Sequence, residues 1–136
     1  MSKTIKLEVI TPEGIKFRGE AESLKVETVE GQIGILPDHC SYFALLAPGE
    51  MVIKYRAKVV KMVYGEGFIK FHSNYSTILA EFAQTPEEVE VERELHLKEE
   101  IQKKLIAFKY KSLKEQEALR RALKIASLRL KLAERE

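Results

Sequence analysis

The sequence changes character at Pro86. All seven glycines and all four prolines lie at or before this residue, and the rest of the chain contains neither. Glycine and proline form the turns between short strands, whereas the interiors of long helices exclude them. The sequence therefore predicts a strand-rich domain over residues 1–85 and a helical domain over residues 86–136.

Before Pro86, apolar residues recur at every second position, which is the period of a strand with one buried face. The alternating series are Ile5, Leu7 and Val9; Ile15 and Phe17; Leu24 and Val26; Ile53, Tyr55, Ala57 and Val59; Ile69 and Phe71; and Ile78, Ala80 and Phe82. Turn-forming residues separate these series at 12–14, 30–31, 37–38, 48–49, 65–67 and 73–74. Short strands with turns at this spacing predict an antiparallel sandwich or barrel.

A first helix is predicted from apolar residues at helical spacing. These residues are Leu97, Ile101, Leu105 and Phe108. The segment 85–88 supplies a cap, a first-turn proline and an acid, which favours a start at Pro86. The alternation of Val89 and Val91 instead favours a start near Glu90, so both positions remain open.

A second helix is predicted from Leu113 to about Ala133, because Ser112 and Glu115 have the spacing of a capping box. Its apolar seam is Leu119, Ala122, Leu123, Ala126 and Leu130. The two small alanines allow another helix to approach closely. A short link between the helices predicts an antiparallel helical hairpin.

The charge is unevenly distributed. Residues 1–100 hold 12 Lys/Arg and 17 Asp/Glu, a net −5, whereas residues 101–136 hold 11 and 4, a net +7. The single cysteine, Cys40, excludes an intrachain disulfide and fits a reducing compartment. The start of the chain lacks the apolar core of a secretory signal, and the longest apolar run, near residues 42–47, is far shorter than the roughly 20 residues of a spanning helix.

No catalytic or metal site is expected. Asp38, His39, Cys40 and Ser41 are residue types found in catalytic sites, but consecutive side chains diverge, whereas a nucleophile must meet its base. The glycines of GQIG and GEG are not followed by Lys-Ser/Thr or by a helix, so they predict turns rather than phosphate loops. The acidic cluster at 87–94 lacks the spacing and glycine of a calcium loop.

The basic tail has four possible interpretations: a solvated helix face, or a surface for an acidic protein, an anionic lipid or a nucleic acid. It consists of Lys103, Lys104, Lys109, Lys111, Lys114, Arg120, Arg121, Lys124, Arg129, Lys131 and Arg135. Nucleic acid is the weakest alternative, because Phe108 and Tyr110 are the only aromatic residues here and no DNA-reading motif is visible.

Several motifs occur in one characteristic order. EGQIGILPDH spans residues 30–39, followed by GEGFIKF at 65–71, TILAE at 77–81, EEVEVER at 87–93 and LRLKLAERE at the end. This series resembles the epsilon subunit of bacterial F-type ATP synthases over nearly the whole chain. The resemblance implies a ten-stranded sandwich followed by two helices, and a non-catalytic rotor subunit of the central stalk in a proton-translocating synthase. It also implies a peripheral location on the cytoplasmic face of the bacterial plasma membrane.

The resemblance implies contacts with the gamma subunit and the c-ring, and membrane association only through the c-ring. Glu30, Gly31 and Gln32 are the expected c-ring contact. The hairpin is expected to regulate ATP hydrolysis by extending toward the alpha and beta subunits. In the extended form, Arg120, Arg121 and Lys124 are expected to meet an acidic segment of the beta subunits.

The resemblance also implies that no cofactor is required here, although some members of this family bind ATP on the folded hairpin. The corresponding motif here is residues 89–94. Arg93 matches this motif and Arg121 matches an arginine of the second helix, whereas Glu90 is one methylene longer than the expected Asp. Glu94, Glu100 and Ile125 depart from the pattern by adding negative charge or removing positive charge. Because ATP is a polyanion, the sequence predicts at most a weak ATP site.

A second hypothesis from another class is a free-standing adaptor whose basic hairpin binds an acidic protein or nucleic acid. The resemblance across both domains favours the rotor subunit.

Overall fold

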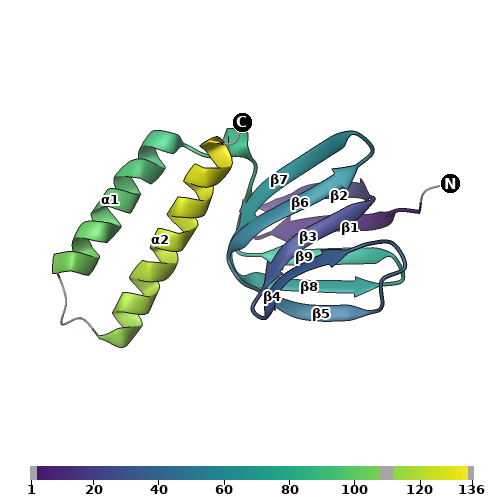
Figure 1. Cartoon of the computed structure of the whole chain (residues 1–136), viewed down its shortest axis with the longest axis horizontal. Helices are drawn as coiled ribbons and strands as arrows, with labels where there is room; N and C mark the ends of the chain where they lie inside the picture. Colours follow the sequence, from purple (N-terminus) through teal and green to yellow (C-terminus); the bar gives the residue numbers. More distant parts are fainter. Residues whose placement is uncertain (1–2, 108–111, 135–136) are drawn as a thin grey trace. The chain divides into compact units, whose positions relative to one another are not determined.

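The computed structural model describes residues 3–107 and 112–134 and divides the chain into two compact units, Met1–Thr85 and Pro86–Glu136 (Figure 1). We call them the sandwich and the hairpin. The strands are β1 (Ile5–Thr11), β2 (Gly14–Ala21), β3 (Ser23–Thr28), β4 (Gly31–Ile35), β5 (Tyr42–Leu46), β6 (Gly49–Tyr55), β7 (Lys58–Tyr64), β8 (Gly67–His72), β9 (Tyr75–Ala80) and β10 (Ala83–Gln84). The helices are η1 (Pro86–Glu88), α1 (Val91–Ala107) and α2 (Leu113–Glu134). The predicted fold, about ten short strands followed by two packed helices, is confirmed.

The strands of the sandwich form one sheet that folds over a shared interior (Figure 1). The order is β10-β7-β6-β3-β5-β8-β9-β1-β2, and β4 pairs with β3 outside this path. The sandwich is antiparallel as predicted except at one pair, because β1 runs parallel to β9. A tight hairpin makes β1 antiparallel to β2 on one side, and β9 enters the sheet beside the start of β1, where the Lys6 N–H donates to the Asn74 carbonyl at 2.9 Å.

The interior is built from the alternating residues of most strands. The largest fully buried side chains are Tyr64, Phe71, Ile5, Leu7, Leu24, Ile35, Leu46, Met51, Ile53, Met62, Ile69 and Ile78. Burying one side chain of this size contributes about 1.5–3 kcal/mol. The predicted series in β1, β3 and β8 are therefore confirmed as core positions, as are Ile78 and Ala80 of β9, whereas Phe82 lies beyond β9 and is only half-buried.

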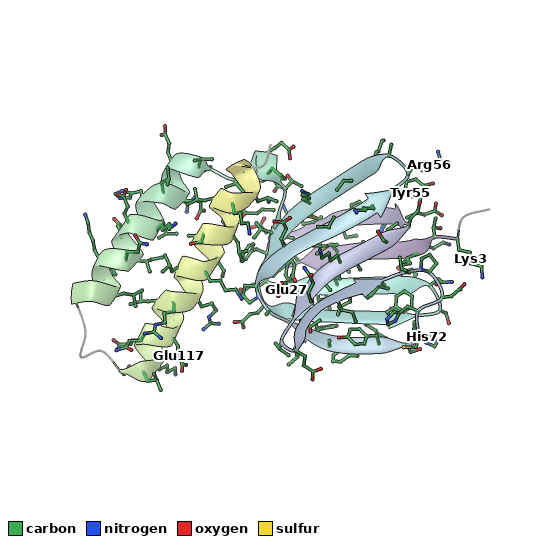
Figure 2. The ribbon with its side chains drawn as sticks, in the orientation of Figure 1. Lys3, Glu27, Tyr55, Arg56, His72 and Glu117 are labelled. Carbon is green, nitrogen blue, oxygen red and sulfur yellow. The ribbon has the colours of Figure 1, made fainter. Side chains whose placement is uncertain are left out.

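The predicted pair Ile15 and Phe17 does not share one face: the β1–β2 register shifts between Val9 and Ile10, so Ile15 is 48% exposed while Phe17 packs against the core. A second predicted series is also wrong. Ile53, Tyr55, Ala57 and Val59 do not lie on one strand, because a two-residue turn at Arg56 and Ala57 separates β6 from β7. Arg56 has a φ of 55°, and its guanidinium lies 5.1 Å from the centroid of the Tyr55 ring at the tip of this hairpin (Figure 2). Val59 is therefore 51% exposed. The turn contains none of the residues that usually mark a left-handed backbone, so the sequence did not reveal it.

At two positions of the strand region, a residue larger than glycine would clash with neighbouring atoms. A Cβ on Gly67 would lie 1.8 Å from the Leu79 carbonyl oxygen, so β8 and β9 can pair there only if the residue is glycine. A Cβ on Gly49 would lie 2.7 Å from the Glu27 side chain and 3.3 Å from the Tyr64 hydroxyl. The Tyr64 ring uses this space to reach β3.

The helices begin where local capping permits. Pro86–Glu88 forms a 3-10 turn, and α1 starts at Val91, with the Glu94 N–H donating to the Glu90 carbonyl at 3.0 Å. Of the two predicted starts, the one near Glu90 is confirmed for the α-helix. The predicted start of α2 is confirmed, because the Glu115 N–H donates to the Ser112 hydroxyl at 3.3 Å.

The helices α1 and α2 pack side by side within the hairpin (Figure 1). Ile101, Ala126 and Leu130 are buried as predicted, whereas Leu97 is 36% exposed. The buried residue in the first turn of α1 is Glu94, which lies almost two turns before Ile101 on the same face of the helix. Phe108, Lys109, Tyr110, Lys111 and Arg135 of the predicted stripe and tail lie outside the described residues.

Candidate partner-binding surfaces

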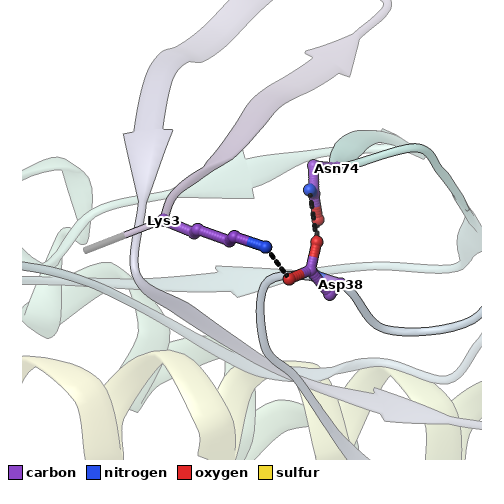
Figure 3. Close-up of polar contacts among 3 residues, drawn as sticks. All are labelled: Lys3, Asp38 and Asn74. Atoms are coloured by element: carbon purple, nitrogen blue, oxygen red, sulfur yellow. Dashed lines mark hydrogen bonds and ion pairs between the residues drawn. The ribbon is translucent and has the colours of Figure 1, made fainter. Parts of the chain in front are cut away.

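The residues that resemble a catalytic set are used to hold the sandwich together. The Asp38 carboxylate accepts from the Lys3 ammonium at 2.7 Å and from the Asn74 amide at 3.0 Å, while the Asp38 N–H donates to Asn74 Oδ1 at 2.6 Å (Figure 3). Asp38 and Asn74 both have left-handed backbones, with φ values of 67° and 59°. This clasp ties the loop after β4 to the β8–β9 turn. The hydrogen bond from Lys3 is the main cause that lowers the pKa of Asp38, and it raises the pKa of Lys3.

The three residues after Asp38 have different main contacts, although Cys40 Sγ lies 3.8 Å from His39 Nδ1. The His39 ring makes edge contacts with Tyr42 and Phe71, at centroid distances of 6.0 and 5.7 Å. Ser41 Oγ lies 2.8 Å from His72 Nδ1, and Cys40 is exposed. No base and nucleophile are held together by a third group, and no cluster of three metal-ligating side chains exists among the described residues.

The residues predicted to contact the c-ring form the tip of the β3–β4 hairpin. The Thr28 hydroxyl donates to the Gly31 carbonyl at 2.7 Å and accepts from the Glu30 N–H at 3.1 Å. Gly31 has a φ of +127°, a conformation that side chains rarely allow. Glu30, Gly31 and Gln32 are all exposed, so this rigid turn presents a carboxylate and an amide to solvent.

Sequence reasoning missed the outward-facing side of five strands, β5, β8, β9, β1 and β2, which we call the outer face. Strand register places one apolar residue from each strand in a line: Leu45, Phe68, Leu79, Ile10 and Ile15. In this apolar row, Leu45 is 56% exposed and Ile15 48%. The neighbouring Phe43 is 62% exposed, and its ring lies 5.4 Å from that of Phe68.

A shallow groove of about 430 Å³ lies over the three middle members of the apolar row, Ile10, Phe68 and Leu79, and is also lined by Pro12 and Glu66. A detectable signal was present in the sequence. In YFALL at residues 42–46, both alternating faces are apolar, which is not expected of a strand with one side in water. Exposed apolar residues in a contiguous row mark a surface for another protein.

The next row of the outer face is polar. The Tyr75 hydroxyl donates to Glu8 Oε1, and an Arg18 guanidinium nitrogen lies 3.5 Å from Glu8 Oε2. The hydrogen bond from Tyr75 is the largest cause that lowers the pKa of Glu8, and the same bond raises the pKa of Tyr75. The outer face therefore combines an apolar row with fixed charges beside it.

The hairpin contains a largely buried ion pair. Arg129 Nη1 of α2 donates to Glu94 Oε1 of α1 at 3.1 Å, and the two side chains are 19% and 8% exposed. No described residue forms a hydrogen bond with the buried Oε2 atom of Glu94. Sequence reasoning identified Glu94 only as an extra negative charge and did not predict its partner.

The residues predicted for ATP lie at two levels of the hairpin. Glu90 and Arg93 form an exposed ion pair at 3.9 Å, next to the first turn of α1. Arg129 is the residue of α2 at that level, whereas Arg121 lies eight residues earlier, ~12 Å along the helix axis. Arg120, Arg121 and Lys124 are exposed on α2. No helix of the described residues is long and apolar enough to span a membrane.

Comparison with known proteins places this geometry in a family. Residues 4–86 match the family described as "ATP synthase, Delta/Epsilon chain, beta-sandwich domain". The chain is 35% identical to the ATP synthase epsilon chain of Clostridium novyi (strain NT), over 91% of this chain and 96% of the relative. It is 37% identical to the ATP synthase epsilon chain of Caldanaerobacter subterraneus subsp. tengcongensis, over 98% and 96%.

Solved structures show the same fold at lower identity. A chain of the Euglena gracilis mitochondrial ATP synthase aligns with a TM-score of 0.79 at 22% identity, covering 91% of this chain and 78% of that one. A chain from the central stalk and c-ring of the Tetrahymena thermophila mitochondrial ATP synthase aligns with a TM-score of 0.66 at 14% identity, covering 97% and 98%. The curated relatives span the sandwich and the hairpin together. The chain therefore belongs to the ATP synthase epsilon chain family and is a non-catalytic, central-stalk subunit of an ATP synthase.

Proposed function

We propose that this subunit is part of the rotor of a proton-translocating F-type ATP synthase, where it links the gamma subunit to the c-ring and regulates ATP hydrolysis through its hairpin. Its location is then peripheral, on the cytoplasmic face of the bacterial plasma membrane, with membrane association only through the c-ring. No cofactor is required, and no nucleic acid is a partner. Family membership supports this role over that of a free-standing adaptor.

The apolar row of the outer face is the observation that supports a gamma contact. Leu45 and Phe43 are more than half exposed, although a solvent-facing strand of a monomer would normally carry polar residues there. Glu8 and Arg18 beside the row supply charges that fix orientation. A stable rotor contact requires such a surface.

Leu45→Glu tests this contact in a pull-down with purified gamma subunit. We expect gamma binding to fall at least about 100-fold, because a carboxylate would be buried without a partner. Val59→Glu is the matched control, since Val59 is 51% exposed but lies on β7, outside the outer face. Equal gamma binding by the Leu45 and Val59 variants, with circular dichroism unchanged, would refute the assignment.

The exposed, rigid tip of the β3–β4 hairpin supports the proposed c-ring contact. In a Cys40→Ser background, a cysteine at Gln32 should cross-link to the c-ring in assembled membranes. A cysteine at Lys58, exposed at the start of β7, serves as the control. Cross-linking from Lys58 but not from Gln32 would contradict the proposal.

The exposed basic residues of α2 support the proposed contact with the beta subunits. Arg120→Ala, Arg121→Ala and Lys124→Ala together should relieve inhibition of ATP hydrolysis in the reconstituted complex, because three cations facing an acidic segment are lost. Alanine at Lys98, Lys103 and Lys104 of α1 removes the same charge elsewhere and should leave inhibition intact. Equal relief by both triple variants would show a non-specific charge effect.

A further inference from the structure

The pair Glu94–Arg129 joins the two helices at one defined place. Glu94 lies in the first turn of α1, and Arg129 lies near the end of α2. The link between Ala107 and Leu113 connects the opposite ends of the helices. The pair is therefore at the open end of the hairpin, where no covalent link holds α1 to α2.

Glu94 is the only charged residue among the buried positions of the described chain. An isolated carboxylate at a buried position is strongly unfavourable, but a paired one is tolerated. Separating α1 from α2 removes the arginine from the carboxylate, so opening must break this contact. The site in the first turn of α1 also favours a negative side chain, because the unpaired N–H groups of the helix start lie nearby.

At this end Leu130 and Leu132 of α2 are buried, but no apolar residue in the first turns of α1 is. Leu97 is 36% exposed and Leu95 47%, so the first turns of α1 contribute little apolar burial. The nearest buried apolar residue of α1 is Ile101, almost two turns further along. At the open end, the directional ion pair therefore fixes the position of α1 against α2, which apolar packing does in the middle of the hairpin.

We propose that Glu94 and Arg129 form a built-in latch that closes the open end of the hairpin, with the Glu94 carboxylate acting as an internal anion, so that closure needs no bound ligand. The latch is a property of the isolated chain. Its effect on ATP hydrolysis rests on the proposed function.

Spin-label distance measurements on the full chain test the latch. In a Cys40→Ser background, one label pair is placed at the exposed residues Glu92 and Lys131, at the open end. A second pair at Lys104 and Lys114 reports on the link end and serves as the control. The variants are Glu94→Gln, Arg129→Met and the double variant Glu94→Leu/Arg129→Met.

Without nucleotide, the wild-type chain should give one short distance at the open end. Glu94→Gln and Arg129→Met should each raise the long-distance population about tenfold at the open end, with no change at the link end. The double variant should return toward the wild-type distribution, because apolar residues of similar size often replace a buried ion pair without loss.

Three results would overturn the latch. They are single variants that stay closed, a double variant as open as the single ones, and a wild-type chain that closes only after millimolar ATP is added. The hydrolysis assay separates the latch from its proposed role. If the single variants open in the isolated chain but leave hydrolysis by the reconstituted complex unchanged, the latch stands and the proposed regulation fails.

Discussion

Replacing Tyr64 with phenylalanine should destabilise the sandwich far more than the loss of one oxygen atom suggests. Strand β3 changes neighbours along its length: Ser23–Lys25 pair with β6, and Thr28 pairs with β5. Glu27 lies where this change occurs. The buried Tyr64 hydroxyl fills the gap, donating to the Glu27 carbonyl at 2.9 Å and accepting from the Glu27 N–H at 2.7 Å.

The size of the stability loss depends on which hydrogen bonds the Glu27 carbonyl and the Glu27 N–H keep in the variant. The Glu27 carbonyl also accepts from the Ala47 N–H at 3.2 Å, so it keeps one partner in the variant. Losing its bond from the Tyr64 hydroxyl should therefore cost about 1 kcal/mol, as for an ordinary hydrogen bond. The Glu27 N–H would lose its partner at a part-buried site, which costs about 1–3 kcal/mol. We therefore expect Tyr64→Phe to lower the free energy of unfolding by about 2–4 kcal/mol.

Thermal and urea denaturation of the full chain measure this change. For a domain of this size, the expected loss corresponds to a fall in Tm of at least about 8 °C. Tyr55→Phe is the control, because Tyr55 is half-buried and its hydroxyl makes no hydrogen bond with the described residues. If both variants lose less than about 0.5 kcal/mol, the Tyr64 hydroxyl does not stabilise the junction of β3, β5 and β6 and the reasoning is refuted.

Four further outcomes are expected. Gly67→Ala should prevent cooperative folding, because its Cβ would lie 1.8 Å from the Leu79 oxygen, whereas Gly34→Ala, with open space around its Cβ, should melt like wild type by circular dichroism. Tyr75→Phe should flatten the acid side of the Tm-against-pH curve. The lowered pKa of Glu8 gives stability that is present above its ordinary pKa of 4.5 and lost as the pH falls, and the variant loses the hydrogen bond that lowers this pKa. Parallel curves for variant and wild type would contradict this prediction. Truncation after Gln84 should leave a cooperative melt, and an unfolded or aggregated fragment would count against an independent sandwich. ATP at millimolar concentration should give little thermal shift, although a submicromolar site would add more than ~4 kcal/mol; a large shift abolished by Arg93→Ala would contradict this expectation.

Period-two patterning was sufficient to predict the sandwich, because core positions recur at every second residue in β1, β3, β8 and β9. It failed where the information is not local. The turn at Arg56 has no glycine, asparagine or proline, and a continuous apolar alternation runs through it. The parallel pairing of β1 with β9 depends on how the sheet folds over itself, which no single strand encodes.

The surfaces were less predictable than the fold. The tip at Glu30 came from a family motif, and the structure explains the motif by the left-handed Gly31 and the Thr28 hydrogen bonds. The apolar row was missed because it joins five strands, and its members become neighbours only through register. Asp38 illustrates the reverse case: a residue type suited to catalysis is held by Lys3 and Asn74 as part of a clasp.

The hairpin shows why the number of basic residues does not measure its affinity for an anion. Arg93 is paired with Glu90, and Arg129 with Glu94, so at the first turn of α1 two guanidinium groups already have carboxylate partners from the same chain. A nucleotide would have to displace these carboxylates or remain beside them, and either alternative costs electrostatic energy. Exposed positive charge also lies in the middle of α2, at Arg120 and Lys124, which are spread over a helix face rather than gathered in a pocket. That arrangement suits the extended surface of an acidic protein better than a small polyanion.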